Sequence, residues 1–213
     1  SKKFIEVFGG SGNLARAFAD EGIPAEVWDI IDGEGANLLR REVRLRLIES
    51  IKNGKITAMS FDFPCDTFSR ARKHDGKGPG PLRDDVWWIM GLPNLSEKDK
   101  NRVHEANLLL KYTVAIMRIA IHHKIPILLE NPASSRLWLT PLMTALFNET
   151  SPKVINVDYC QYDNNPWRKP TKFIAWNWPE LHLHTCKPGR LCSKSGKPHI
   201  ELFGKIGNTF KTK

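Results

Sequence analysis

The Pro64-Cys65 step is the part of the sequence best suited to nucleophilic chemistry. It follows the apolar, β-prone segment 56–63. The carboxyl end of a strand is where α/β folds place their reactive groups, and basic residues nearby are expected to lower the pKa of a thiol. The alternative is a cysteine that only fills space, which is the more common fate of a lone cysteine. On its position, we predict that Cys65 is a nucleophile.

A second reactive group follows another predicted strand. Glu130 ends the apolar run 125–129 and precedes Asn131-Pro132. A thiolate and a protonated carboxyl across one pocket suit an electron-poor ring, because the thiolate attacks a ring carbon while the acid protonates a ring nitrogen. An acid that only caps the following turn is the alternative. We predict that Glu130 is the partner of Cys65.

The glycine-rich turn at residues 9–12 predicts a cofactor site. It follows a predicted strand, and Asp29 ends the next strand, 20 positions after Gly9. Glycines let the backbone approach an adenosyl ligand closely, and a strand-end carboxylate can accept hydrogen bonds from ribose hydroxyls. The turn lacks the Lys-Ser/Thr of a phosphate loop, which favours an adenosyl ligand over a triphosphate. The expected cofactor contacts are Phe8, Gly9, Gly10, Ser11, Gly12, Asn13, Leu14, Asp29 and Ile30.

Basic residues gather after Cys65. The chain has 32 Lys and Arg against 23 Asp and Glu, a net charge of +9, which suits a surface that binds nucleic acid. Segment 70–95 mixes cations with glycines and prolines, and this composition predicts a mobile basic loop. We expect this loop to bind nucleic acid through Arg70, Arg72, Lys73 and Arg83.

The C-terminal segment contains a candidate metal site. Cys186, Cys192 and His199 are separated by five and six residues, and Cys160 or His184 can complete a tetrahedral zinc set. Such a set would stabilise a region that has little apolar content. Free thiols and a surface histidine are the alternative. We expect any zinc to be structural, because Cys65 already accounts for the chemistry, and this use of cysteine favours an intracellular protein.

The elements that must position these residues alternate between strands and helices. Strands are predicted at 4–8, 25–28 and 56–63, with helices at 13–19 and 38–52 between them. This βαβαβ pattern predicts a parallel, doubly wound, Rossmann-like α/β sheet with its ligand at the carboxyl ends of the strands. A helix capped by Ser96 is expected to reach residue 121, followed by a strand at 125–129, a short helix at 141–147 and strands at 154–157 and 171–176. We expect one domain over 1–178 and a short appendage over 179–213.

The sequence resembles DNA cytosine-5 methyltransferases in four motifs that come in the family's order. Residues 6–13 are similar to the cofactor motif, 64–69 to the catalytic-cysteine motif and 130–132 to the catalytic-acid motif. Pro166-Trp167-Arg168-Lys169 is similar to the arginine motif that holds the target base. Residues 205–208 are similar to the family's final cofactor motif. The resemblance covers roughly residues 4–176.

The resemblance implies a class I methyltransferase fold that binds S-adenosylmethionine on the 8–14 loop and Asp29. It also implies that Cys65 adds to C6 of a cytosine, that Glu130 engages N3 and that Arg168 holds O2. Because C5 of cytosine is inaccessible inside a stacked duplex, the base must be flipped out or come from a single strand. The implied partner is nucleic acid, with DNA favoured over RNA.

The chain also departs from the family. Asp66 replaces the glutamine that usually follows the cysteine, and the residues after Arg168 are too few for the usual target-recognition domain. We therefore expect low sequence specificity, or specificity supplied by a protein partner. A noncatalytic nucleic-acid-binding module and an RNA cytosine methyltransferase are the alternatives. No membrane partner is expected, since no apolar run reaches the roughly 18 residues that a span needs.

Overall fold

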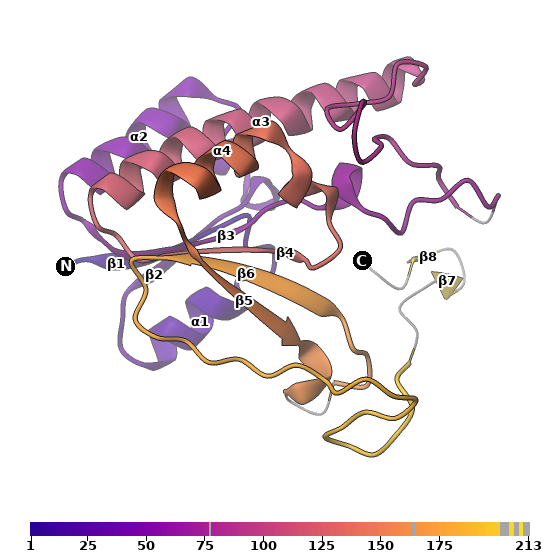
Figure 1. The fold of residues 1–213 in the computed structure, drawn as a ribbon. Helices are drawn as coiled ribbons and strands as arrows, with labels where there is room; N and C mark the ends of the chain where they lie inside the picture. The colour runs from indigo at the N-terminus through magenta and orange to yellow at the C-terminus, as the bar shows by residue number, and fades with distance from the viewer. Residues whose placement is uncertain (77, 163–164, 201–204, 207–208, 211–213) are drawn as a thin grey trace.

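A six-stranded sheet with helices on both faces forms the centre of the structure, a computed structural model (Figure 1). The structure describes residues 1–76, 78–162, 165–200, 205–206 and 209–210. The strand order is β2-β1-β3-β4-β6-β5. The strands are β1 (Lys3–Val7), β2 (Ala25–Trp28), β3 (Ile56–Asp62), β4 (Ile127–Pro132), β5 (Lys153–Asp158) and β6 (Pro170–Trp176). A separate pair joins β7 (Lys205–Ile206) and β8 (Thr209–Phe210).

The first four strands pair in parallel, as the βαβαβ pattern predicts. Strand β6 differs, because it runs antiparallel to both β4 and β5. A parallel connection needs a crossover of about a dozen residues or more, usually through a helix, whereas β5 and β6 are joined by the short segment 159–169. The predicted doubly wound α/β fold is therefore confirmed, with one antiparallel strand inserted between β4 and β5.

The helices divide between the two faces of the sheet (Figure 1). Helix α1 (Asn13–Asp20) covers one face, while α2 (Arg41–Lys52), α3 (Glu97–His122) and α4 (Pro141–Thr150) cover the other. Successive side chains of β1 point to opposite faces of the sheet. Phe4 stacks on Phe18 of α1 with ring centroids 3.9 Å apart, whereas Ile5 and Val7 belong to the larger core under α2, α3 and α4.

Helix boundaries follow local signals in the sequence. Ser96 caps α3 as predicted, since its hydroxyl accepts a hydrogen bond from the Asp99 N–H at 3.2 Å. Gly12 caps α1 with a φ of 67°, and a Cβ there would lie 2.6 Å from Cγ2 of Val27. Only glycine fits this turn without strain. None of the described helices is both long and apolar enough to cross a membrane.

The segment between η3 (Asp66–Phe68) and α3 is fastened by a buried arginine. Arg83 is 1% exposed, and its guanidinium lies 3.9 Å from the centroid of the Phe68 ring. It donates to the Thr67 hydroxyl at 3.0 Å, to the Asn107 carboxamide oxygen at 2.8 Å and to a loop carbonyl. Burial lowers the pKa of Arg83 to about 10. Arg83 was predicted to bind nucleic acid, but in this structure its buried guanidinium is engaged inside the protein and holds the loop against α3.

Replacing Arg83 tests this anchoring role. We expect Arg83→Met to lower the free energy of unfolding by roughly 2–4 kcal/mol, because the groups that it satisfies lose their donors. The matched control is Arg70→Met, which breaks only the exposed ion pair with Asp85 and should cost about 1 kcal/mol or less. Urea unfolding followed by circular dichroism measures both. Equal losses in the two variants would show that Arg83 has no anchoring role.

Candidate active site

The register of the parallel strands brings the two predicted reactive groups to one edge of the sheet. Val7 pairs with Phe61, Phe61 with Leu129, and Asp62 with Glu130. Cys65 follows Asp62 by three residues, and the Glu130 carboxyl is near enough to raise the pKa of the Cys65 thiol. The structure therefore brings Cys65 and Glu130 together.

A side chain from β4 fixes the loop that carries the cysteine. The Asn131 amide, which is fully buried, donates to the Phe63 carbonyl at 2.6 Å. Cys65 then begins η3, where its carbonyl accepts from the Phe68 N–H at 3.0 Å. The thiol and the acid are thus positioned by adjacent residues of β4, Glu130 and Asn131.

Three carboxyl groups lie close together at this edge. Burial, reinforced by Glu130 and Glu6, raises the pKa of Asp62 to about 8. Burial also raises the pKa of Glu130, while Lys169 and a hydrogen bond with Tyr159 act in the opposite direction. The buried Oε1 atom of Glu130 has no hydrogen-bond partner among the described residues. Glu130 is therefore biased toward its neutral form and has an oxygen left for a ligand.

The Cys65 thiol differs from the expectation, because its pKa is raised rather than lowered. Burial is the largest cause and Glu130 the second, with Lys169 acting the other way. Cys65 still reaches solvent. The arginines of the loop are engaged elsewhere, since Arg70 pairs with Asp85 at 2.7 Å and Arg72 with Asp66 at 3.2 Å. The free thiol is therefore neutral at pH 7.

Two neighbouring cations after β5 have different partners. Arg168 binds Asp158, with 3.0 Å between Nε and Oδ1, and donates to the Cys186 carbonyl at 3.4 Å. Lys169 instead lies with Nζ 4.7 Å from the centroid of the Tyr159 ring, and its charge acts on Cys65 and Glu130. The structure therefore places Lys169, and not Arg168, beside the thiol and the acid.

Sequence reasoning missed several members of this site. Asp62 had a usable signal, because it ends the strand three residues before Cys65. Lys169 belongs to the segment that is similar to the arginine motif, although the resemblance gave a role only to its neighbour, Arg168. Tyr159 had no signal, since its contact with Glu130 depends on how β5 and β6 pair across the sheet.

A cavity of about 390 Å³ lies beside the thiol loop, at the carboxyl ends of β1, β2 and β3. Among the predicted cofactor residues, Phe8, Asp29 and Ile30 line it, together with Asp62 and Pro64. The remaining six form the turn and the start of α1 next to it: Gly9, Gly10, Ser11, Gly12, Asn13 and Leu14. The volume lies within the usual range for small-ligand sites.

The chemistry of the cavity fits an adenosyl ligand. Asp29 accepts hydrogen bonds from the Gly10 N–H at 2.9 Å and the Ile31 N–H at 3.0 Å, one on each carboxylate oxygen. Each oxygen keeps a lone pair for a further donor such as a ribose hydroxyl. Phe8 has a φ of 62°, which is unusual for a bulky residue. Such strained residues cluster at ligand sites.

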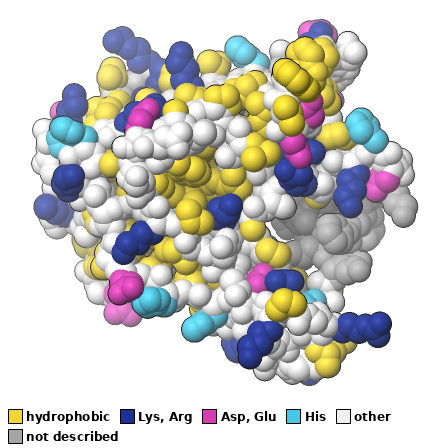
Figure 2. Space-filling view, viewed as in Figure 1, with side chains coloured by type: hydrophobic (Ala, Val, Ile, Leu, Met, Phe, Trp, Pro, Cys, Tyr) yellow, Lys and Arg dark blue, Asp and Glu magenta, His cyan; other side chains and the backbone are white. Residues whose placement is uncertain are grey.

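The loop before α3 presents an aromatic tip. The side chains of Val86, Trp87 and Trp88 are 70%, 85% and 48% exposed. Asp84 shapes the tip by accepting from the Val86 N–H at 3.0 Å and the Trp88 N–H at 2.6 Å. Figure 2 shows hydrophobic side chains gathered at the upper right, over the segment that precedes α3. Lys73 lies exposed in the same loop.

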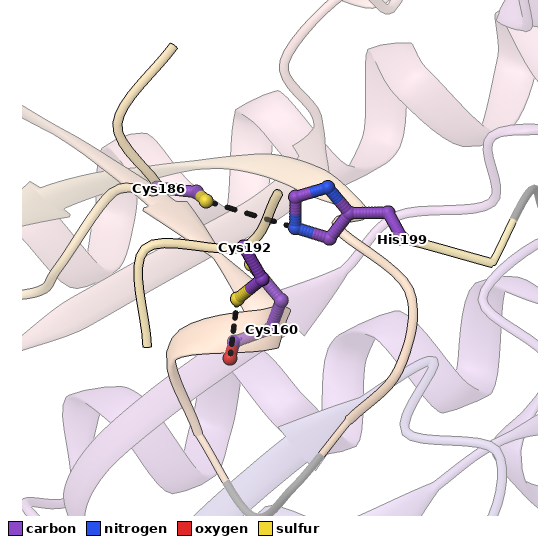
Figure 3. A group of neighbouring side chains, drawn as sticks. All are labelled: Cys160, Cys186, Cys192 and His199. Atoms are coloured by element: carbon purple, nitrogen blue, oxygen red, sulfur yellow. Dashed lines mark hydrogen bonds between the residues drawn. The ribbon is translucent and has the colours of Figure 1, made fainter. Parts of the chain in front are cut away.

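The predicted metal ligands meet at a second, separate place. Ligand atoms of Cys160, Cys186, Cys192 and His199 all lie within 4.8 Å of one another (Figure 3). His184 is not part of this group, because its ring stacks on Tyr162. Gly207 and Asn208, which belong to the segment similar to the final cofactor motif, lie outside the described residues.

Alkylation of Cys65 tests the electrostatics of the site. We expect iodoacetamide to modify Cys65 slowly at pH 7 and faster as the pH rises, because thiolate forms only near its raised pKa. Glu130→Gln removes the negative charge that Glu130 carries once it ionises, so it should lower the pKa of Cys65 and increase the rate at pH 8 several-fold. Peptide mass spectrometry follows the Cys65 peptide, with Glu149→Gln, a remote surface change, as control. A slower reaction in Glu130→Gln would contradict the assigned coupling.

Comparison with known proteins gives structural neighbours only. No protein-family model matches the chain, and no curated protein matches it by sequence. Among solved structures it is similar to the Entamoeba histolytica methyltransferase EhMeth, with a TM-score of 0.49 and 16% identity over 89% of this chain and 58% of that chain. It is also similar to the S. pombe Dnmt2 methyltransferase, with a TM-score of 0.35 and 13% identity over 85% of this chain and 51% of that chain. The chain therefore spans little more than half the length of these methyltransferases.

Proposed function

We propose that the protein is an S-adenosylmethionine-dependent methyltransferase that modifies C5 of cytosine in nucleic acid, with DNA favoured over RNA. The observation that carries this proposal is that Cys65 and Glu130 lie close together at one edge of the sheet, beside a cavity that suits an adenosyl ligand. The Asn131 bond to the Phe63 carbonyl holds the two groups in fixed relation. A scaffold that only binds nucleic acid needs neither a nucleophile nor a partly neutral acid.

Each group has a defined part in the proposed reaction. The Cys65 sulfur bonds to C6 of the ring and releases its proton to water, while Glu130 transfers its proton to N3. This leaves C5 electron-rich. S-adenosylmethionine supplies the methyl group that C5 takes. Water then takes the C5 proton as the bond between sulfur and C6 breaks, the Cys65 thiolate that leaves regains a proton from water, and Glu130 recovers its proton from N3.

The raised pKa values suit this sequence of events. A neutral acid is needed to protonate N3, and burial biases Glu130 toward that form. Because the thiol is also neutral before the reaction, its proton must leave as the bond to C6 forms. Lys169 lies where a cation can meet the polar edge of the ring, so we assign it the base-holding role that the resemblance gives to Arg168.

A nucleic-acid substrate is supported by charge and by exposed aromatic surface. The net charge is +9. The C-terminal tail, residues 179–200, lies at the lower right of Figure 2 and has four exposed basic side chains: Lys187, Arg190, Lys194 and Lys197. The Trp87 tip offers a ring on which a base can stack. This tip and the tail are the surfaces that would contact a strand.

A noncatalytic nucleic-acid-binding module is the second candidate. Two features favour it: burial raises the pKa of the Cys65 thiol, and Arg168 is bound to Asp158. In that case the exposed tip and the basic tail would carry the whole function. Methyl transfer and strand binding therefore need separate tests.

Methyl transfer is tested with labelled S-adenosylmethionine and duplex DNA, single-stranded DNA and RNA as acceptors. We expect label in 5-methylcytosine, with a loss of at least about 100-fold in Cys65→Ala and in Glu130→Gln. Lys169→Met should reduce transfer more than Arg168→Met. Equilibrium binding of S-adenosylmethionine, which Cys65→Ala should leave unchanged, is the control. Undiminished transfer by Cys65→Ala would refute the covalent mechanism.

Strand binding is tested at the aromatic tip. Loss of one stacked base costs about 1–3 kcal/mol, so Trp87→Ala should weaken binding of a labelled single strand by roughly 5- to 100-fold. Val86→Ala changes an exposed side chain of the same tip that has no ring, and it should change affinity less than about 2-fold. Fluorescence anisotropy at constant salt measures both. Equal affinities for wild type and Trp87→Ala would exclude the tip from the binding surface.

A further inference from the structure

In the C-terminal segment, residues 177–200, the buried side chains are thiols. Of residues 177–200, only Cys186 and Cys192 are buried, at 3% and 4% exposure. They pack with Cys160 of η5 (Tyr159–Gln161) in a cluster apart from the main core. Three small side chains bury too little apolar surface to order a segment of this length. Some further interaction must stabilise it.

The donor set and its surroundings match a closed tetrahedral metal site. With metal–sulfur bonds of about 2.3 Å, the ligand atoms of a tetrahedral zinc site lie about 3.8 Å apart. Here all four ligand atoms lie within 4.8 Å of one another, and the Cys186 sulfur is 3.6 Å from Nε2 of His199. The cysteines are free, so no disulfide accounts for the cluster.

Hydrogen-bond donors surround the sulfur atoms, as expected for thiolates that bind a metal. The Ser193 N–H donates to the Cys186 sulfur at 3.4 Å. The Gln161 amide donates to the Cys160 sulfur at 3.3 Å and lies 3.7 Å from the Cys192 sulfur. A tight turn after Cys192 presents it, with the Gly196 N–H bonded to the Cys192 carbonyl at 2.9 Å.

We propose that Cys160, Cys186, Cys192 and His199 bind one zinc ion, and that this ion fastens the C-terminal segment to the part of the chain that supplies the partners of Glu130. All four positions are filled by protein, so the site is structural and has no open position for a substrate. Soft thiolate ligands disfavour magnesium and calcium, and a closed set of three cysteines and one histidine is typical of structural zinc.

The metal site is connected to Glu130 in two ways, each through residues that are adjacent in the chain. Cys160 directly follows Tyr159, which hydrogen-bonds to Glu130. On the other side, Asp158 accepts from the Cys186 N–H at 2.7 Å and binds Arg168, which directly precedes Lys169. Releasing the metal should therefore loosen Tyr159 and Lys169 but leave the cofactor cavity, which lies on β1, β2 and β3, unchanged.

Metal content and proteolysis test the site without relying on enzymatic activity. We expect one zinc per chain by elemental analysis, and an intense visible spectrum of tetrahedral cobalt(II) after substitution. Cys186→Ser should weaken the metal affinity by more than about 100-fold, since changes even outside the ligand shell cost 10- to 100-fold. Cys65→Ser and His184→Ala, which change a cysteine and a histidine outside the set, should keep a full equivalent. His199→Cys should also retain zinc.

Chelation of the wild-type protein avoids variants that fail to fold. Trypsin should then cleave after Arg190 and Lys194 at least about 10-fold faster, because these exposed sites lie in the segment that the metal holds. Metal-free wild type after expression with added zinc, or equal zinc in Cys186→Ser and wild type, would overturn the proposal. Unchanged proteolysis after chelation would overturn the fastening role.

The proposed link between the zinc site and Glu130 rests on the proposed function, because its readout is methyl transfer. In the chelated protein, methyl transfer should fall at least about 10-fold while the affinity for S-adenosylmethionine changes less than 2-fold. If wild type transfers no methyl group, the proposed function fails, but metal content and proteolysis still decide the zinc site. If transfer is unaffected by chelation, the link fails and the proposed function stands.

Discussion

Parallel pairing of β1, β3 and β4 is the constraint on which the rest of the site depends. The pairing aligns the ends of β1 and β3 with the middle of β4, so that the segments after Val7 and Asp62 leave the sheet beside Glu130. It also places Glu6, Asp62 and Glu130 in one neighbourhood, where water is largely excluded. Carboxyl groups that are buried together cannot all be ionised without a large free-energy cost. Neutral acid at this edge is therefore a result of the sheet's register.

The same edge gives each carboxyl group a different task. Glu6 is used by the fold, because its Oε2 accepts the Ala15 N–H at 2.6 Å and caps the start of α1. Asp62 borders the cavity, and Glu130 keeps one oxygen without a partner. The contrast follows from position: Glu6 faces a helix terminus with unpaired N–H groups, while Oε1 of Glu130 meets no donor among the described residues. Three chemically similar groups are thus separated into structural and reactive ones.

The sequence was informative wherever the structure follows from residues that are close together in the chain. Alternating apolar runs located every strand of the large sheet, and Ser96 located the start of α3 within one residue. Chain order was enough to bring Cys65 and Glu130 to one edge. It was not enough for Arg83, because a charge in a basic loop gives no local sign that it will pack on Phe68. The raised pKa of Cys65 was missed for the same reason, since it arises from burial and a residue 65 positions away.

The contacts across the C-terminal half depend on geometry that no local pattern contains. The antiparallel insertion of β6 brings the segment 159–169 back to the edge, and this return decides which of two adjacent cations meets Glu130. Residue type and spacing named Cys186, Cys192 and His199, with Cys160 or His184 as the fourth ligand, and the fold brings Cys160 into the group.

Helix α3 gives the molecule a mechanical property. Its 26 residues extend over about 39 Å. The second half is clamped in the core through Leu110, Val114 and Met117. The first half carries the loop, since Asn107 binds Arg83 and Arg102 binds Asp66 beside the cysteine. The aromatic tip and the loop that carries Cys65 are therefore both held by the first half of α3, so that a displacement of this half would move the two together.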